Sequence, residues 1–272
     1  MSIWRFRHPD RPTLIAGPCV VEGDEVMDQI ATRLAETGAA LGIPICFKAS
    51  FDKANRSRAG AGRGPGLDDG LAALERVRRN TGLPILTDVH EAGQVERVAP
   101  TVDVVQIPAF LCRQTDLLVA SGRAGRPVNI KKGQWMDPAS MAGAAEKVRE
   151  GAGGATELAV TERGTFFGYG DLVVDVRSFD RMRRATQAAV LFDATHAVQQ
   201  PGRGTAGASG GLREAVPALM LAAAAAGVDG FFVETHPDPS RAQSDAETQW
   251  PLDQLEALLR RVLRVWHAAR ES

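Results

Sequence analysis

The chain has 272 residues, of which 28 are glycine and 15 are proline; 44% are hydrophobic and 24% are charged. These proportions are typical of a globular protein and exclude a fibrous or intrinsically disordered chain. Lys and Arg total 32 against 33 for Asp and Glu, which gives a formal net charge of -1. The chain therefore lacks the large positive field with which proteins hold nucleic acids.

The sequence carries neither a membrane-span signal nor a secretory signal. Its longest uncharged stretch, residues 215–228, is shorter than the ~20 apolar residues that a spanning helix needs. The first eight residues contain Arg5 and Arg7 and no apolar segment. Cys19, Cys46 and Cys112 are too few and too scattered for a disulfide framework. We therefore expect a cytoplasmic protein.

Short apolar runs alternate along the chain with longer segments of helical period. The runs predict strands at residues 13–17, 43–48, 84–88, 102–107, 127–131, 157–161, 189–193 and 230–234. The segments between and after them predict helices near residues 24–41, 67–80, 91–99, 115–125, 138–150, 209–227 and 252–269. This alternation indicates a parallel sheet with crossover helices.

Eight such units without a linker favour an α/β fold in the form of a single (β/α)8 TIM barrel. We assign residues 13–272 to this barrel and residues 1–12 to a short N-terminal extension. An open, doubly wound sheet is the alternative fold.

Polar side chains stand at or just after the end of each predicted strand, where the active site of a barrel lies. They are Cys19, Lys48, Asp88, Gln106, Lys131, Arg163, Asp193 with His196, and Glu234. One polar residue at a strand end is commonplace because loops begin there. The complete ring of them predicts a catalytic site.

Basic residues are concentrated at the same strand ends and in the loops that follow them. These basic residues are Lys48, Lys53, Arg56, Arg63, Arg113, Lys131 and Arg163. Only five of the 32 basic residues are lysines, and four of those fall at positions 48, 53, 131 and 132. Ammonium and guanidinium groups bind phosphate and carboxylate oxygens, so the pattern predicts small, multiply charged anionic ligands. The alternatives are a Schiff-base lysine that attacks a carbonyl carbon, and a barrel that binds phosphate without catalysis.

A second group of side chains has the chemistry of metal ligands, namely Cys19, His196, Glu234 and Asp245. The first, seventh and eighth strands are neighbours in a closed barrel, so these residues can converge. His236 is an alternative imidazole, and a buried, inert thiol is the alternative for Cys19. His90 and Glu91 are candidates for general acid–base roles or for the polar start of a helix.

Several motifs together resemble the 3-deoxy-D-manno-octulosonate 8-phosphate synthase family. They are residues 15–19 (Ile-Ala-Gly-Pro-Cys), 47–57, 87–91 (Thr-Asp-Val-His-Glu), 106–116 and 129–134 (Asn-Ile-Lys-Lys-Gly-Gln). Later matches follow in family order, so the similarity covers roughly residues 13–260. The segment Lys-Ala-Asn-Arg-Ser at residues 53–57 separates this family from a related synthase that uses erythrose 4-phosphate.

The resemblance implies a barrel that condenses phosphoenolpyruvate with arabinose 5-phosphate and water and releases phosphate. Such a transferase serves Kdo and lipopolysaccharide biosynthesis and forms homotetramers. One branch of the family has Asn at the position of Cys19 and needs no metal. The cysteine branch, which this chain resembles, uses a divalent ion such as Mn, Fe, Co or Zn.

The resemblance also implies roles for individual residues. The metal ligands would be Cys19, His196, Glu234 and Asp245. The substrate-binding residues would be Lys48, Lys53, Asn55, Arg56, Ser57, Gln106, Pro108, Ala109, Lys131, Arg163 and, from a neighbouring subunit, Arg113. The catalytic group would comprise Cys19, Lys53, Asp88 and His196. Residues 58–62 depart from the family's usual Ser-Ile-His-Ser, and they lie next to the expected site of the sugar phosphate.

Overall fold

Eight parallel strands close into a ring in the computed structural model, which describes residues 3–55, 60, 62–204 and 210–271. The ring strands are β1 (Thr13–Gly17), β2 (Ile45–Lys48), β3 (Ile85–Asp88), β4 (Val104–Ile107), β5 (Val128–Lys131), β6 (Leu158–Glu162), β9 (Ala189–Asp193) and β12 (Gly230–His236). Strand β12 pairs with both β9 and β1, which closes the barrel. The barrel prediction is confirmed, and the open sheet is wrong.

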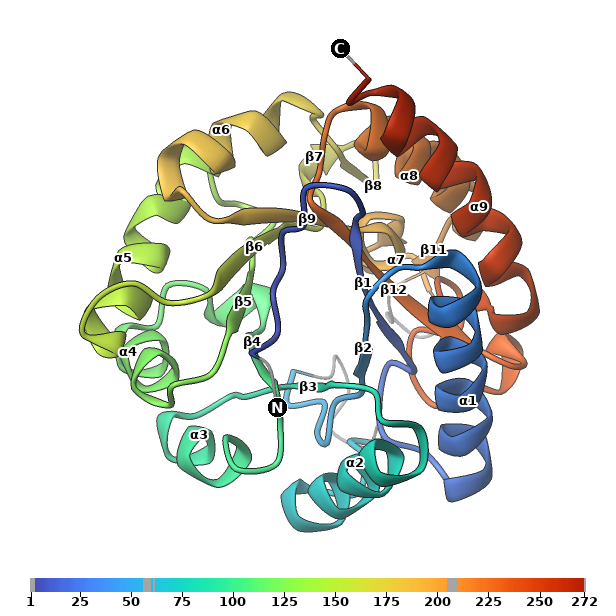
Figure 1. The fold of residues 1–272 in the computed structure, drawn as a ribbon, viewed down its shortest axis with the longest axis horizontal. Helices are drawn as coiled ribbons and strands as arrows, with labels where there is room; N and C mark the ends of the chain where they lie inside the picture. Colours follow the sequence, from blue (N-terminus) through green and yellow to red (C-terminus); the bar gives the residue numbers. More distant parts are fainter. Residues whose placement is uncertain (1–2, 56–59, 61, 205–209, 272) are drawn as a thin grey trace.

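Helices surround the strands as an outer ring (Figure 1). They are α1 (Asp24–Leu41), α2 (Leu67–Thr81), α3 (Ala92–Val98), α4 (Thr115–Arg123), α5 (Met141–Ala152), α6 (Arg177–Thr186), α8 (Val216–Ala225) and α9 (Leu252–Ala268). The predicted helices occur, but the one expected over 209–227 begins at Val216, after a 3-10 turn at Arg213–Ala215. Helix α6 was not predicted. No helix within the described residues is long and apolar enough to cross a bilayer.

Short elements that follow β6, β9 and β12 lie at the carboxyl end of the barrel. They are the hairpin of β7 (Thr165–Gly168) and β8 (Asp171–Val173), the helical turn α7 (Ala194–Ala197), the paired β10 (Gln199–Gln200) and β11 (Gly210–Gly211), and β13 (Trp250–Pro251). The turn α7 matters for the site because it carries His196 directly after β9.

The barrel interior changes from apolar to polar along several of the strands. Side chains two residues apart share a face of a strand. Pairs such as Leu86 with Asp88 and Leu191 with Asp193 therefore place an apolar residue deep in the barrel and a polar one above it. The apolar members pack in one buried cluster together with Trp4, which comes from the N-terminal segment. The polar members lie at the carboxyl end, where they form the floor of a cavity.

The N-terminal segment crosses the opposite end of the ring (Figure 1). Phe6 is fully buried, and its backbone N–H donates to Glu157 Oε1 at 2.8 Å. Arg7 pairs with Asp229, just before β12, at 3.1 Å. These contacts cover the amino end of the barrel with apolar rings and leave the carboxyl end as the open one.

Helices α4 and α5 approach so closely that a methyl group does not fit between them. A Cβ added at Gly122 would lie 2.0 Å from the carbonyl oxygen of Val148. We expect Gly122→Ala to lower the free energy of unfolding by ~1–3 kcal/mol through overpacking. Gly143→Ala in α5, where an added Cβ meets nothing within 4 Å, is the control and should leave stability unchanged or slightly raised. Equal thermal midpoints for both variants would contradict the prediction.

Candidate active site

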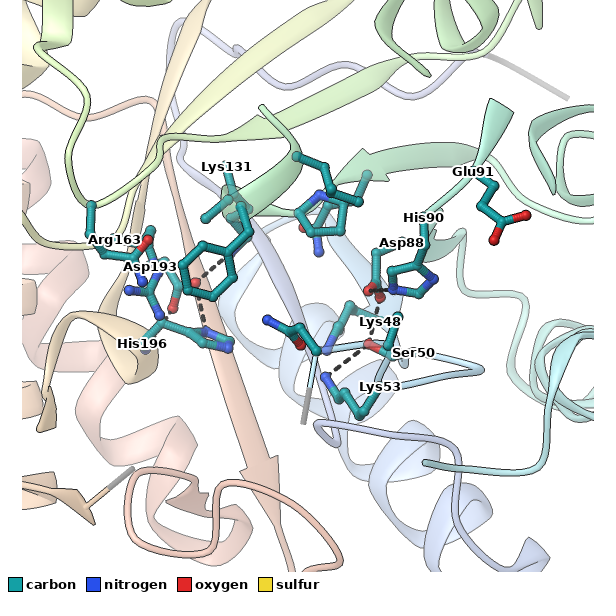
Figure 2. A pocket seen from close by; sticks show the side chains of 18 residues that line it. Lys48, Ser50, Lys53, Asp88, His90, Glu91, Lys131, Arg163, Asp193 and His196 are labelled. Atoms are coloured by element: carbon teal, nitrogen blue, oxygen red, sulfur yellow. Dashed lines mark hydrogen bonds and ion pairs between the residues drawn. The ribbon is translucent and has the colours of Figure 1, made fainter. Parts of the chain in front are cut away.

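A cavity of about 350 Å³ opens at the carboxyl ends of the strands. The sequence-predicted residues that line it are Lys48, Lys53, Asn55, Asp88, Gln106, Pro108, Ala109, Lys131, Arg163 and His196. They come from the ends of β2 to β6, from the loops that follow, and from α7. Closing the barrel therefore brings together side chains that are up to about 150 residues apart in the chain (Figure 2).

One side of the cavity is formed by Arg163, Asp193 and His196 (Figure 2). Arg163 Nη2 donates to Gln199 Oε1 at 2.6 Å. Its other terminal nitrogen, Nη1, is buried without a hydrogen-bond partner among the described residues. Because a buried guanidinium nitrogen is costly to leave unpaired, Nη1 is a donor suited to a bound anion.

Lys131 lies between the two sides and pairs with Asp193, while its ammonium group sits 3.0 Å from the centre of the Phe232 ring. Burial lowers the pKa of Lys131 to about 8, although the charge of Asp193 opposes this shift. Burial also raises the pKa of Asp193, but His196 and Lys131 outweigh it and hold that pKa well below its usual range. Lys131 is thus a cation that can lose its proton in mildly basic solution.

The other side contains Asp88, His90, Ser50 and Lys53 (Figure 2). His90 Nε2 lies 3.2 Å from Asp88 Oδ2, and the Ser50 hydroxyl donates to Asp88 Oδ1. Lys53 Nζ in turn donates to Ser50 Oγ at 3.0 Å. Burial raises the pKa of Asp88, but the hydrogen bond and charge of His90 and the two nearby lysines hold that pKa below its usual range. Asp88 is therefore an anion that orients its neighbours.

Next to the cavity, ligand atoms of Cys19, Glu234 and Asp245 lie within 4.8 Å of one another. His196 Nε2 lies 3.8 Å from Glu234 Oε1 and 3.8 Å from Asp245 Oδ2. The structure thus brings the four predicted metal ligands to one place. His236 is directed elsewhere: its Nε2 lies 3.6 Å from Glu22 Oε2.

The chemistry of this cluster fits a divalent cation. Glu234 Oε2 is buried without a hydrogen-bond partner among the described residues. Burial raises the pKa of Cys19 well above its ordinary value, and the charges of Asp245 and Glu234 raise it further. The protonated thiol donates to Asp245 Oδ2 at 3.0 Å. A cation would replace that proton and fill the gap between a thiolate and two carboxylates.

Lys48 connects the cation-binding cluster to the cavity. Its ammonium group donates to Glu234 Oε1 at 2.7 Å and to the Cys19 carbonyl oxygen at 2.8 Å, and its side chain is 2% exposed. Burial raises the pKa of Glu234, but the charges of Lys48, His196 and Lys53 bring it down to about 2. Glu234 is therefore ionised throughout the neutral range and available as a ligand.

Some predicted residues are not placed in the cavity. Arg113 lines a separate hollow together with Trp135 and Lys147. Arg56, Ser57 and most of the unusual stretch at residues 58–62 lie outside the described residues. Ser50, Gln134 and Gln199 were not among the predicted site residues, although each lines the cavity or holds a residue that does. Ser50 could have been found, because it lies two residues after Lys48, a spacing that keeps both side chains on the same face of an extended chain.

Comparison with known proteins shows the family to which this chain is related. The sequence profile described as the DAHP synthetase I family matches residues 8–268. A 2-dehydro-3-deoxyphosphooctonate aldolase from Methylobacillus flagellatus is 53% identical over 251 residues, covering 92% of this chain and 89% of that protein. The aldolase of the same name from Methylobacterium radiotolerans is 54% identical over 260 residues, covering 95% of this chain and 90% of that protein.

A third protein of this name, from Alkalilimnicola ehrlichii, is 53% identical over 257 residues, covering 94% of this chain and 91% of that protein. The family resemblance deduced from the motifs is thereby confirmed. The chain belongs to the DAHP synthetase I family, within the group of 2-dehydro-3-deoxyphosphooctonate aldolases.

Proposed function

We propose that this protein condenses phosphoenolpyruvate with arabinose 5-phosphate and water to give 3-deoxy-D-manno-octulosonate 8-phosphate and inorganic phosphate. The observation that carries the proposal is a pair of basic side chains in the cavity. Lys53 and Arg163 line the same cavity, and neither forms an ion pair with a described residue. Two such cations, on opposite sides of the cavity, suit two phosphorylated reactants (Figure 2).

Phosphoenolpyruvate would bind near Arg163, Lys131 and Gln106, with Lys48 and Lys53 adding positive charge. These groups neutralise its carboxylate and phosphate, so C3 can approach a second anion. The acceptor aldehyde would lie toward Asp88 and Asn55, at the side where Arg56 and Ser57 follow in the chain. Holding the two carbons at ~3–3.5 Å supplies much of the rate enhancement, because the reactants repel each other in solution.

The reaction forms a bond between C3 of phosphoenolpyruvate and the aldehyde carbon, adds water at C2 and breaks the bond from C2 to the phosphate oxygen. Lys53 and His90 line the cavity on the side proposed for the acceptor, where they would move a proton to the new hydroxyl group. Burial lowers the pKa of His90, but its hydrogen bond with Asp88 outweighs this effect and raises that pKa above its ordinary value. This raised pKa favours the protonated imidazole of His90.

A divalent ion would be held by Cys19, His196, Glu234 and Asp245, and Mn, Fe, Co and Zn all suit this ligand set. When bound, it supplies Lewis acidity next to the reacting groups. Lys48 positions Glu234 through a hydrogen bond. Asp193 positions His196, whose Nδ1 lies 2.8 Å from Asp193 Oδ2. The family resemblance further suggests a cytoplasmic homotetramer in which Arg113 reaches the site of a neighbouring subunit.

The decisive experiment measures phosphate release from phosphoenolpyruvate with a panel of four- and five-carbon aldose phosphates, each with and without added metal. Arabinose 5-phosphate should be the best acceptor by a wide margin. Because residues 58–62 differ from the family pattern, the panel includes ribose 5-phosphate and erythrose 4-phosphate. Faster turnover of either of these would overturn the proposed acceptor, and binding without turnover of any acceptor would make the protein a non-catalytic binder.

A lysine-dependent aldolase is the second candidate because the pKa of Lys131 is lowered to about 8 by burial. An amine with such a pKa is a nucleophile near neutral pH. Borohydride reduction in the presence of pyruvate should then attach a stable adduct to Lys131, which mass spectrometry detects. We expect no adduct, because the ammonium group of Lys131 already pairs with Asp193 and contacts the Phe232 ring.

The same pKa predicts how substrate binding depends on pH. Lys131 is charged below pH 8 and neutral above it, so its attraction for an anion is present at pH 7 and is lost as the pH rises. We expect kcat/KM for phosphoenolpyruvate to fall several-fold between pH 7 and 9, with a midpoint near 8. Lys131→Arg, which stays charged, should lose this midpoint. A midpoint unchanged in that variant would assign the titration to another group.

A further inference from the structure

A chain of hydrogen bonds crosses three neighbouring strands beneath the cavity. The Thr161 hydroxyl on β6 donates to Asn129 Oδ1 on β5 at 2.6 Å, and Asn129 Nδ2 donates to Gln106 Oε1 on β4 at 3.0 Å. Asn129 and Thr161 are fully buried, and Gln106 is 4% exposed. Of the three, only Gln106 lines the cavity. The other two therefore lie one layer away from any ligand bound there.

The direction of this chain is set at its buried end. A hydroxyl group has one proton, and Asn129 Oδ1 is the acceptor that the described residues offer to Thr161. If the Asn129 amide were turned over, its NH2 group would face Thr161, and the buried hydroxyl proton would lose that acceptor. The carbonyl oxygen of Asn129 therefore points to Thr161, and its NH2 group points to Gln106.

The orientation of Gln106 follows from that of Asn129. Gln106 Oε1 is engaged by Asn129, and Gln106 Nε2 donates to no described residue. The free NH2 group of Gln106 is thus the part available to a ligand in the cavity. The reverse orientation would present a carbonyl oxygen to anionic reactants, which the oxygen would repel.

We propose that Thr161 and Asn129 are positioning residues that fix the polarity of Gln106, so that its NH2 group donates to an oxygen of phosphoenolpyruvate. The inference rests on the proposed function for the identity of that ligand. Thr161 and Asn129 are fully buried and do not line the cavity. They would nevertheless determine which end of the Gln106 amide faces the substrate.

The test compares Thr161→Val, which removes the hydroxyl at nearly constant shape, with Thr161→Ser, which keeps it. Thr161→Val should raise both the KM and the calorimetric dissociation constant for phosphoenolpyruvate roughly tenfold, the value of one hydrogen bond to a charged group. Its kcat should change less than its KM. Thr161→Ser should stay close to the wild-type values. Thr161→Ala also lacks the hydroxyl and replaces the valine variant if that one does not fold.

A double-mutant cycle separates positioning from a general loss of stability. Gln106→Leu removes the donor itself, so adding Thr161→Val to it should weaken phosphoenolpyruvate binding no further. Fully additive effects would overturn the inference, as would a Thr161→Val protein with a lower thermal midpoint but unchanged affinity. The proposed function fails separately: a wild-type protein without turnover would refute it, and the calorimetric cycle would still decide the role of Thr161.

Discussion

Removing divalent cations from the purified protein is expected to reduce phosphate release by about 100-fold or more, since Lewis acidity of this kind contributes several kcal/mol to a reaction. The expectation rests on a thiol, two carboxylates and an imidazole whose ligand atoms face one another. Added Mn, Fe, Co or Zn should restore the rate, and the ion that restores it best at low concentration identifies the preferred metal. Full activity in protein shown to be metal-free by elemental analysis would refute the assignment.

Cys19→Ser tests the same site without a chelator. A serine hydroxyl is a far weaker ligand than a thiolate, so metal content and metal-dependent activity should both fall. Cys46→Ser is the matched control, because Cys46 is also a fully buried, free cysteine but belongs to the apolar layer deeper in the barrel. The control should lose stability by ~1–3 kcal/mol and keep its metal. Equal metal loss in both variants would indicate damage to the barrel rather than loss of a ligand.

The sequence was sufficient to predict the barrel and the polar ring because strand periodicity determines both. In β3 and β9, an apolar residue is followed two positions later by an aspartate. The strand face that packs in the core therefore also carries an aspartate of the site. Because the strands close into a ring, their carboxyl ends become neighbours, and no knowledge of individual side-chain contacts is needed to predict this. Helix α6 was missed for the opposite reason: its sequence is dominated by arginines, and Phe179 and Met182 are its only large buried side chains.

The partners of the site residues could not be predicted. Nothing in the sequence indicates that Lys131 pairs with Asp193, or that Gln199 holds one end of Arg163. Such pairings depend on side-chain directions across segments that are tens of residues apart, and a strand pattern determines only which face a residue occupies. The sequence therefore predicted which groups are present, and the structure shows which of them remain free for a ligand.

Asp193→Asn is expected to weaken metal binding and substrate binding together, because one carboxylate serves both. Asp193 Oδ2 pairs with Lys131 and lies 2.8 Å from His196 Nδ1, and Asp193 Oδ1 accepts from the His196 backbone N–H at 2.9 Å. Losing a carboxylate that orients a metal-binding imidazole typically costs about 10–100-fold in metal affinity. Lys131 would also lose its counter-charge, so its pKa should fall further, and the pH midpoint of kcat/KM for phosphoenolpyruvate should move below 8.

Asp229→Asn distinguishes this coupled effect from a general loss of stability. Asp229 is a buried carboxylate that pairs with Arg7 and Arg183 at the amino end of the barrel, away from the cavity. Breaking its ion pairs should lower the thermal midpoint but leave metal affinity and the pH midpoint unchanged. If Asp193→Asn lowered metal affinity without moving the pH midpoint, the carboxylate would serve His196 alone. Both contacts of Asp193, with His196 and with Lys131, depend on its negative charge, which Asp193→Asn removes. If metal affinity and the pH midpoint both stayed unchanged, Asp193 would therefore have no part in metal binding or in substrate binding.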